Sequence, residues 1–378
     1  MTIRYEKKDF KSILNKYKFI DSWFWCRYSI NAYNGCEHAC TYCDSRSHKY
    51  HLHPEFDQVI YVKNNVEKML DSRLCRARTL LPDVVAMSGT CDPYQPAELK
   101  FENTKRCLDV LAKHKYPVLI GTKATLVMRD SELLARIADN NWCTVNVTIT
   151  TTNPDLSKFL EPQAPLPKER FDTISKLKKI KKLQVGVNLM PIVPFLSDSD
   201  EALENIVRDT KAAGADFLLF AAGMTMRDKQ AVWFLSQLSK EYPKLVDEYL
   251  KLYNAQLTSD GYLGSYGPNK IYGQKITKKM LGLCNKYKIN YRMKRFIPED
   301  FRKYNYMIAE ELLNEAFVLQ YTSKPWSNLH WAGQNIQNLK ESIADIAARG
   351  ELKNIRNVNA DLEQRINEYL SNINVWKF

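Results

Sequence analysis

Short apolar segments recur through the first 225 residues and alternate with longer amphipathic segments. Six of the short segments have the length of a strand, at 23–33, 84–87, 118–120, 145–149, 185–189 and 217–220. Continuous apolar runs predict buried parallel strands, and alternation of apolar and polar residues predicts a strand with two different faces. If the aliphatic residues of 145–149 face the helices, Thr148 and Thr150 face the interior, where their hydroxyls could bind a ribose.

Helices are expected between these strands, because apolar residues recur there with helical spacing. Their predicted ranges are 64–76, 104–113, 131–138 and 168–180. Alternating strands and helices indicate a parallel sheet with right-handed crossovers. Six strand–helix units are too few for a closed eight-stranded barrel, so we predict an α/β fold, a partial (β/α)6 TIM-like barrel whose open side admits a large substrate.

The alternation ends near residue 226. From there the pattern predicts mostly helix, at 230–254, 299–320 and 336–370. We therefore divide the chain into a polar, lysine-rich lead-in (1–22), a barrel (23–225) and a helical C-terminal extension (226–378).

Composition limits the class of protein. No apolar run approaches the length of a transmembrane helix, and the N-terminus is charged with no apolar segment behind it, so we expect a cytoplasmic protein and no membrane partner. The net charge of +12 favours an anionic partner or substrate. Nine cysteines without a regular spacing are better explained as metal ligands and buried thiols than as disulfides.

Three cysteines, Cys36, Cys40 and Cys43, follow the first predicted strand with the spacing Cys-x3-Cys-x2-Cys. Catalytic loops of (β/α) barrels lie at this end of their strands. Three thiolates suit a [4Fe–4S] cluster with one iron left open, and they are one ligand short of a closed zinc site. The alternative is a zinc knuckle with His38 or His48 as the fourth ligand, as in a non-catalytic zinc or iron–sulfur nucleic-acid-binding protein.

Other strand ends carry candidate residues. The second predicted strand ends in a stiff loop of small residues and prolines, residues 88–96, in which the backbone can approach a ligand closely. Lys123 lies just past the third strand, where it can meet a carboxylate or be merely exposed.

A basic, aromatic stretch lies at 270–303. It holds eleven lysines and arginines against Glu299 and Asp300, with tyrosines and phenylalanines between them. Basic residues mixed with aromatic rings are typical of binding to single-stranded or flipped bases. The competing interpretation, which we favour slightly, is a charged helical cap whose aromatic residues pack into the core.

Over roughly residues 30 to 225 the chain resembles the spore-photoproduct-lyase-like branch, often labelled DNA repair photolyase, of the radical S-adenosylmethionine (SAM) superfamily. The segments that carry the likeness are the cysteine loop, 92–98, Thr122-Lys123 with Arg129-Asp130, 148–151, Glu161-Pro162 leading to Arg170, and 191–194.

The resemblance implies two cofactors, a [4Fe–4S] cluster on Cys36, Cys40 and Cys43 and SAM on its open iron. It further implies an electron donor such as flavodoxin or ferredoxin, and cleavage of SAM to a 5′-deoxyadenosyl radical that abstracts a substrate hydrogen atom. Individual residues would contact SAM: Tyr42 and Met190 near the adenine, Lys123 at the carboxylate, Thr148 at the ribose, and Ser88, Gly89 and Thr90 at the amino group. Between Glu161 and Arg170 we expect an ion pair that fixes their loop.

Two positions differ from the lyase. Asp44 follows the last cluster cysteine where the lyase has a tyrosine, and Cys91 is shifted along its loop relative to the hydrogen-donor cysteine of the lyase. We therefore consider Cys91 as a radical relay or hydrogen donor and leave the substrate open, with a nucleic acid as one hypothesis. Cleavage of SAM needs neither position.

Overall fold

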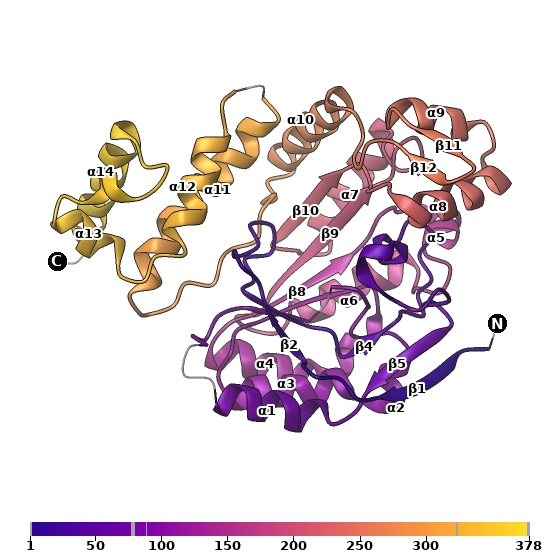
Figure 1. The fold of residues 1–378 in the computed structure, drawn as a ribbon, viewed down its shortest axis with the longest axis horizontal. Helices are drawn as coiled ribbons and strands as arrows, with labels where there is room; N and C mark the ends of the chain where they lie inside the picture. The colour runs from indigo at the N-terminus through magenta and orange to yellow at the C-terminus, as the bar shows by residue number, and fades with distance from the viewer. Residues whose placement is uncertain (1, 77–79, 88, 323, 376–378) are drawn as a thin grey trace. The chain divides into compact units, whose positions relative to one another are not determined.

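Six parallel strands, neighbours in the order in which the chain makes them, form the central sheet (Figure 1). They are β3 (Tyr28–Ile30), β6 (Val85–Met87), β7 (Val118–Thr122), β8 (Cys143–Thr148), β9 (Gln184–Ile192) and β10 (Phe217–Ala222). The strand β2 (Leu14–Lys16) pairs antiparallel with β3 at one edge. The predicted partial (β/α)6 barrel is confirmed.

The computed structural model describes residues 2–76, 80–87, 89–322 and 324–375. Contacts divide the chain into two units. The first comprises Met1–Lys16 and Tyr28–Met293, and the second comprises Tyr17–Arg27 and Lys294–Phe378.

Helices of the first unit cover the sheet with their apolar sides. They are α1 (Val66–Cys75), α2 (Ala97–Phe101), α3 (Asn103–Lys113), α4 (Ser131–Asn140), α5 (Pro154–Leu160), α6 (Pro167–Leu177) and α7 (Asp200–Ala212). Leu108 and Leu111 of α3 and Leu134 of α4 are completely buried. In Figure 1, α1, α3 and α4 lie side by side. Short 3₁₀ helices η1 (Asp44–Arg46), η2 (His48–Tyr50) and η3 (Thr125–Asp130) occur in the connecting loops.

The first predicted strand, 23–33, was wrong in its extent. Only residues 28–30 join the central sheet, and β4 (Tyr33–Asn34) joins a second sheet with β1 (Arg4–Lys8) and β5 (Val59–Lys63). The carboxylate of Asp21 accepts bonds of 2.8 Å from the backbone N–H groups of Trp23 and Phe24, which bends this segment into a turn. Its aromatic residues therefore reflect burial rather than a strand.

The segment after β10 belongs to the first unit as far as Met293, although we placed a boundary near residue 226. It consists of α8 (Asp228–Glu241), α9 (Leu245–Leu252), the hairpin β11 (Gln256–Thr258) and β12 (Gly261–Leu263), and α10 (Lys270–Lys286). The single helix predicted at 230–254 is divided, because Pro243 cannot continue a helix.

Four helices of the second unit follow residue 294: α11 (Arg302–Gln320), α12 (Ser327–Ile336), α13 (Ile343–Ala348) and α14 (Ala360–Val375), with η4 (Leu352–Asn354) between the last two. The predicted helix 336–370 is interrupted, because Ser342 caps α13 and Gly350 has a φ of 68°. Within the described residues, no helix has the length and hydropathy needed to cross a membrane.

The close contact between β9 and β10 at Gly186 gives a prediction on stability. A Cβ on Gly186 in β9 would lie 2.5 Å from the ring of Phe217 in β10, so Gly186→Ala should lower the free energy of unfolding by about 1–3 kcal/mol through overpacking. The matched control is Gly282→Ala in α10, where a Cβ meets nothing within 4 Å and alanine favours the helix by about 0.5–1 kcal/mol. In thermal unfolding, the melting temperature should fall for Gly186→Ala and rise for Gly282→Ala. Equal melting temperatures of the two variants would contradict this packing.

Candidate active site

The cysteine loop begins at a position that only glycine can occupy. Gly35 has a φ of 104°, and a Cβ there would lie 2.6 Å from the carbonyl oxygen of Val59 and 2.7 Å from that of Phe56. The next residue, Cys36, donates its backbone N–H to the Phe56 carbonyl at 2.8 Å. The start of the loop is thus fixed by backbone contacts to the segment that enters β5.

Residues of the stiff loop after β6 hold the cysteine loop from one side. The amide of Gln95 donates to the Gly35 carbonyl and accepts from the Glu37 N–H, both at 3.0 Å. The carboxylate of Glu37 in turn accepts from the Ala97 N–H at 2.7 Å. Gln95 is completely buried, so these bonds replace water along the backbone of the cysteine loop.

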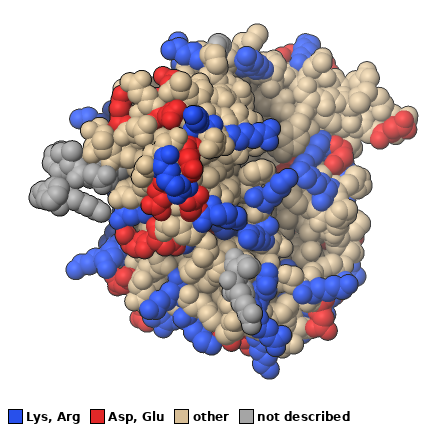
Figure 2. All heavy atoms as spheres, turned by 60° about the vertical axis from the view of Figure 1, so that its left-hand side comes forward, with Lys and Arg blue, Asp and Glu red and all other residues tan. Residues whose placement is uncertain are grey.

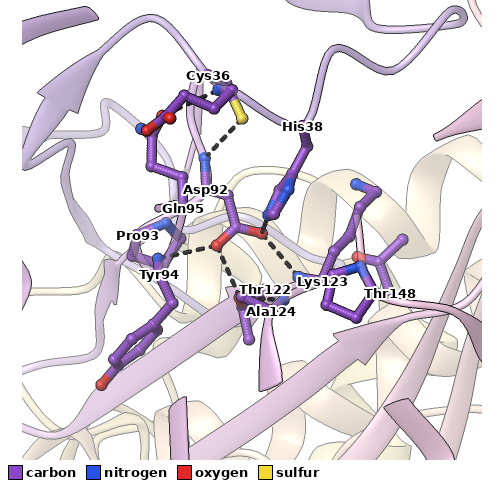
Figure 3. A network of polar contacts seen from close by, with 12 residues as sticks. Cys36, His38, Asp92, Pro93, Tyr94, Gln95, Thr122, Lys123, Ala124 and Thr148 are labelled. Carbon is purple, nitrogen blue, oxygen red and sulfur yellow. Dashed lines mark hydrogen bonds and ion pairs between the residues drawn. The ribbon is translucent and has the colours of Figure 1, made fainter. Parts of the chain in front are cut away.

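Asp92 lies at the centre of the site (Figure 3). Its carboxylate accepts hydrogen bonds from the Thr122 hydroxyl and the Lys123 N–H, both at 2.7 Å, and from the Tyr94 N–H at 2.9 Å. Burial raises the pKa of this carboxyl, but His38 and these donors outweigh it and lower the pKa to about 2. Asp92 belongs to a segment that carries the family likeness, but its role was not predicted; the Asp-Pro-Tyr turn was the available signal.

His38 is engaged by protein groups on both ring nitrogens. Its Nε2 lies 3.3 Å from the Asp92 carboxylate, and its Nδ1 lies 3.3 Å from the Gln163 carbonyl oxygen. Within the described residues, the thiols of the loop do not form a set of three donors within 4.8 Å of one another, with or without His38. A single zinc ion needs such convergence, whereas a [4Fe–4S] cluster takes each thiolate on a different iron. The donor set therefore fits the cluster.

Tyr42 fixes the other side of the cysteine loop through a buried ion pair. Its hydroxyl donates to Glu161, and Arg170 donates to the other oxygen of the same carboxylate. The expected Glu161–Arg170 pair is thus present, with both side chains about 1% exposed. Burial raises the pKa of Glu161, but Arg170 and Lys123 outweigh it, so the net shift is downward. Burial and then Glu161 raise the pKa of Tyr42 well above its usual range.

Lys123 brings a positive charge to the loop. Its Nζ lies 5.8 Å from the centre of the Tyr42 ring. Burial lowers the pKa of Lys123, but Cys40 in its thiolate form and the carboxylates of Glu161 and Asp92 raise it by more, so the net shift is upward and the side chain stays an ammonium. Burial raises the pKa of the Cys40 thiol to about 12, so that iron coordination has to displace its proton.

The remaining predicted SAM contacts follow the ends of neighbouring strands. Thr148 is the last residue of β8 and lies beside Lys123 in Figure 3, and Met190 lies near the end of β9. After β6, the Thr90 N–H donates to Asn31 Oδ1 at 3.1 Å, and Gly89 packs against the same side chain. Ser88 lies outside the described residues.

Cys91 lies in a mainly apolar environment. It packs in an apolar cluster with Ala32, Tyr33, Ile60 and Val62, and its thiol donates to the Tyr33 carbonyl at 3.3 Å. Burial raises the pKa of this thiol to about 12. A role as hydrogen donor stays a prediction.

Comparison with known proteins agrees with this geometry. The model of the Radical SAM superfamily matches residues 30–209. A Mycobacterium bovis protein named "Uncharacterized protein Mb2609c" is 32% identical over 70% of this chain and 75% of its own length. The chain belongs to the radical SAM superfamily.

Solved structures have the same fold. A mutant spore photoproduct lyase matches this radical SAM protein with a TM-score of 0.55 and 15% identity, over 75% of this chain and 79% of that chain. A second mutant, with bound AdoMet and dinucleoside spore photoproduct, matches with a TM-score of 0.52 and 15% identity, over 71% and 76% of the two chains.

Radical SAM proteins use a [4Fe–4S] cluster and SAM, and these are the cofactors of this chain. Cys36, Cys40 and Cys43 would hold the cluster. When bound, the cluster supplies the electron that cleaves SAM. The chain contributes the buried polar contacts that orient the loop and the cationic Lys123 beside it.

The ion pair under Tyr42 can be tested by mutation. Glu161→Gln leaves the buried Arg170 without a counter-charge, and loss of one partner of a buried pair costs about 3–5 kcal/mol of unfolding free energy. The control, Asp155→Asn, breaks an exposed pair with Lys158 and should cost about 0–1 kcal/mol. Chemical denaturation at pH 7 measures both.

The difference in unfolding free energy between wild type and Glu161→Gln should depend on pH. Because the folded pKa of Glu161 is lowered, its contribution is complete above the pKa of the unfolded carboxyl, about 4.3. It is lost as the pH falls through the lower folded value, so wild type and Glu161→Gln should converge in stability there. A constant difference between them would mean that Glu161 is not ionised in the fold.

Proposed function

We propose that this protein cleaves SAM reductively and directs abstraction of a hydrogen atom from a substrate. The observation that carries the proposal is the clamping of one three-cysteine loop between two buried carboxylates, Asp92 and Glu161. The Asp92 N–H lies 3.5 Å from the Cys36 sulfur, and the hydroxyl of Tyr42 donates to Glu161. Both contacts hold the loop through protein groups alone.

Side chains around the loop would then position SAM. In this proposal the Lys123 ammonium binds the carboxylate, the Thr148 hydroxyl binds the ribose, and Tyr42 and Met190 flank the adenine. The backbone carbonyl oxygens at 88–90 would accept from the amino group. A flavodoxin or ferredoxin would deliver the electron.

The first test is formation of 5′-deoxyadenosine by anaerobically reconstituted protein with dithionite and SAM, followed by mass spectrometry. The wild type should form it, and a variant with Cys36, Cys40 and Cys43 all changed to Ala should not. Cys75→Ser, at an exposed cysteine outside the loop, is the control and should retain product. A full iron load without product, with and without added DNA or RNA, would contradict the proposal.

Two further variants divide the roles. Lys123→Met should raise the KM for SAM by about 10- to 100-fold, the cost of one charged hydrogen bond.

Cys91→Ala should keep the uncoupled formation of 5′-deoxyadenosine but lose substrate turnover if Cys91 donates the hydrogen atom. Unchanged turnover removes Cys91 from the mechanism.

A nucleic-acid substrate is favoured by one specific observation. A surface pocket of about 570 Å³ along α1 is lined by four cations, Lys11, Lys68, Arg73 and Arg76, and by no carboxylate. Within the described residues, none of these cations has a carboxylate partner within 4.0 Å. We name the four residues the basic groove. Unpaired cations in a concave site suit phosphate groups. Lys and Arg side chains are also widespread over the face in Figure 2.

The stretch 270–303 supports this hypothesis less well. The hydroxyl of Tyr272 donates to Asp198 at 2.9 Å, and that of Tyr287 donates to Glu204 at 2.8 Å. Both hydroxyls are thus bonded to carboxylates in or just before α7, which favours the interpretation of a charged cap with packed aromatic residues.

The basic groove predicts a salt dependence. The logarithm of the affinity for a DNA oligonucleotide should fall linearly with the logarithm of the salt concentration. Changing Lys68, Arg73 and Arg76 to Ala should reduce that slope by about 2–3, roughly one per phosphate contact. The control changes three exposed lysines elsewhere, Lys176, Lys179 and Lys181, to Ala. Binding insensitive to salt, or an equal reduction in both variants, would exclude the groove.

A further inference from the structure

A second group of metal-binding side chains lies on two adjacent helices outside the active site. Asp71 and Cys75 are four residues apart on α1, so they lie on one face of that helix. His114 directly follows α3 as its C-cap residue, and α3 packs against α1. Among the described residues, this is the one set of three metal-binding side chains whose donor atoms all lie within 4.8 Å of one another.

The three donors converge on one point. His114 Nε2 lies 2.8 Å from Asp71 Oδ1 and 3.9 Å from Cys75 Sγ, and the sulfur lies 4.0 Å from Asp71 Oδ2. In a Cys–His–Asp proton relay, the thiol and the carboxylate contact opposite nitrogens of the imidazole. Here one nitrogen faces both groups. The arrangement is therefore that of a ligand set, not of an activated nucleophile.

We propose that Asp71, Cys75 and His114 bind a Zn²⁺ ion. Thiolate, imidazole and carboxylate together are a zinc ligand set, and a sulfur ligand disfavours Mg²⁺ and Ca²⁺. Zinc–ligand bonds of about 2.0–2.3 Å place tetrahedral donors about 3.3–3.8 Å apart. The two contacts of the sulfur need to shorten only slightly, and the Asp71–His114 contact needs to open. Three protein ligands leave the fourth position to water.

Lys113 now occupies part of this site. Its Nζ lies 2.8 Å from the same Asp71 oxygen that contacts His114, and its side chain is 64% exposed. The ammonium therefore competes with a metal ion for Asp71, and it can move into solvent when the ion binds.

Zinc at this position would join the end of α1 to the end of α3. Since the three ligands converge only in the folded chain, binding should raise the melting temperature with zinc concentration. The site does not depend on the proposed reaction: Cys75 is the exposed cysteine of the nine, and none of the three ligands belongs to the loop that binds the cluster.

The test uses the cluster-loaded protein, dialysed anaerobically against micromolar Zn²⁺, with zinc and iron per chain measured by mass spectrometry. The wild type should bind one additional equivalent of zinc with its iron retained. Cys75→Ser and His114→Ala should each weaken zinc binding by at least about tenfold, since loss even of a group that only orients a ligand costs that much. Asp109→Asn, at an exposed carboxylate of α3 outside the site, should bind zinc as the wild type does.

Lys113→Ala separates a metal site from an ordinary polar cluster. Removal of the competing ammonium should tighten zinc binding severalfold and enlarge the rise in melting temperature. No zinc in the wild type above the dialysis background, or equal zinc in wild type, Cys75→Ser and His114→Ala, would overturn the proposal. Formation of 5′-deoxyadenosine should be unchanged in Cys75→Ser, so that failure here is distinct from failure of the radical SAM assignment.

Discussion

The buried carboxylate of Asp92 is the constraint on which the site depends. It lies where three segments meet: the cysteine loop with His38, its own loop after β6, and the end of β7 with Thr122. A charge in this position is costly unless it is hydrogen-bonded, and here two backbone N–H groups and a hydroxyl donate to it, with the His38 imidazole 3.3 Å away. Its partners are therefore held to one arrangement, and the Cys36 sulfur is held with them.

Two further polar networks extend this arrangement on either side. On one side Glu98 accepts from Tyr33 and Arg129, and Tyr94 donates to Asp130. On the other side Glu161 joins Tyr42 to Arg170. Buried networks of this kind favour a single geometry, although Nη2 of Arg170 has no hydrogen-bond partner within the described residues. The segments that carry the family likeness lie far apart along the chain, because each contributes some of the polar residues that surround the cysteine loop.

The segment after β10 also contributes to the cysteine loop. Arg227 and Thr225 donate to Asp44, and the Ser47 hydroxyl donates to Asp228 at 2.6 Å. The residues that lead into α8 thus hold those that follow Cys43. A region that the apolar pattern assigns to a separate helical extension is in this way part of the support for the cluster loop.

The sequence alone determined the positions of five central strands, though not their full lengths, and most of the helices around them, because these depend on local periodicity. It also predicts Cys36, Cys40 and Cys43 as the cluster ligands, from their spacing. The tertiary structure decided what Asp92, Gln95 and Glu161 do, since their partners Lys123, Gly35 and Tyr42 lie 31, 60 and 119 residues away and meet them only in the folded chain. It also decided the sheet of β1, β5 and β4, and the meeting of Asp71 and Cys75 with His114. Periodicity reports which face of an element is buried; it carries no information on which distant polar group lies opposite.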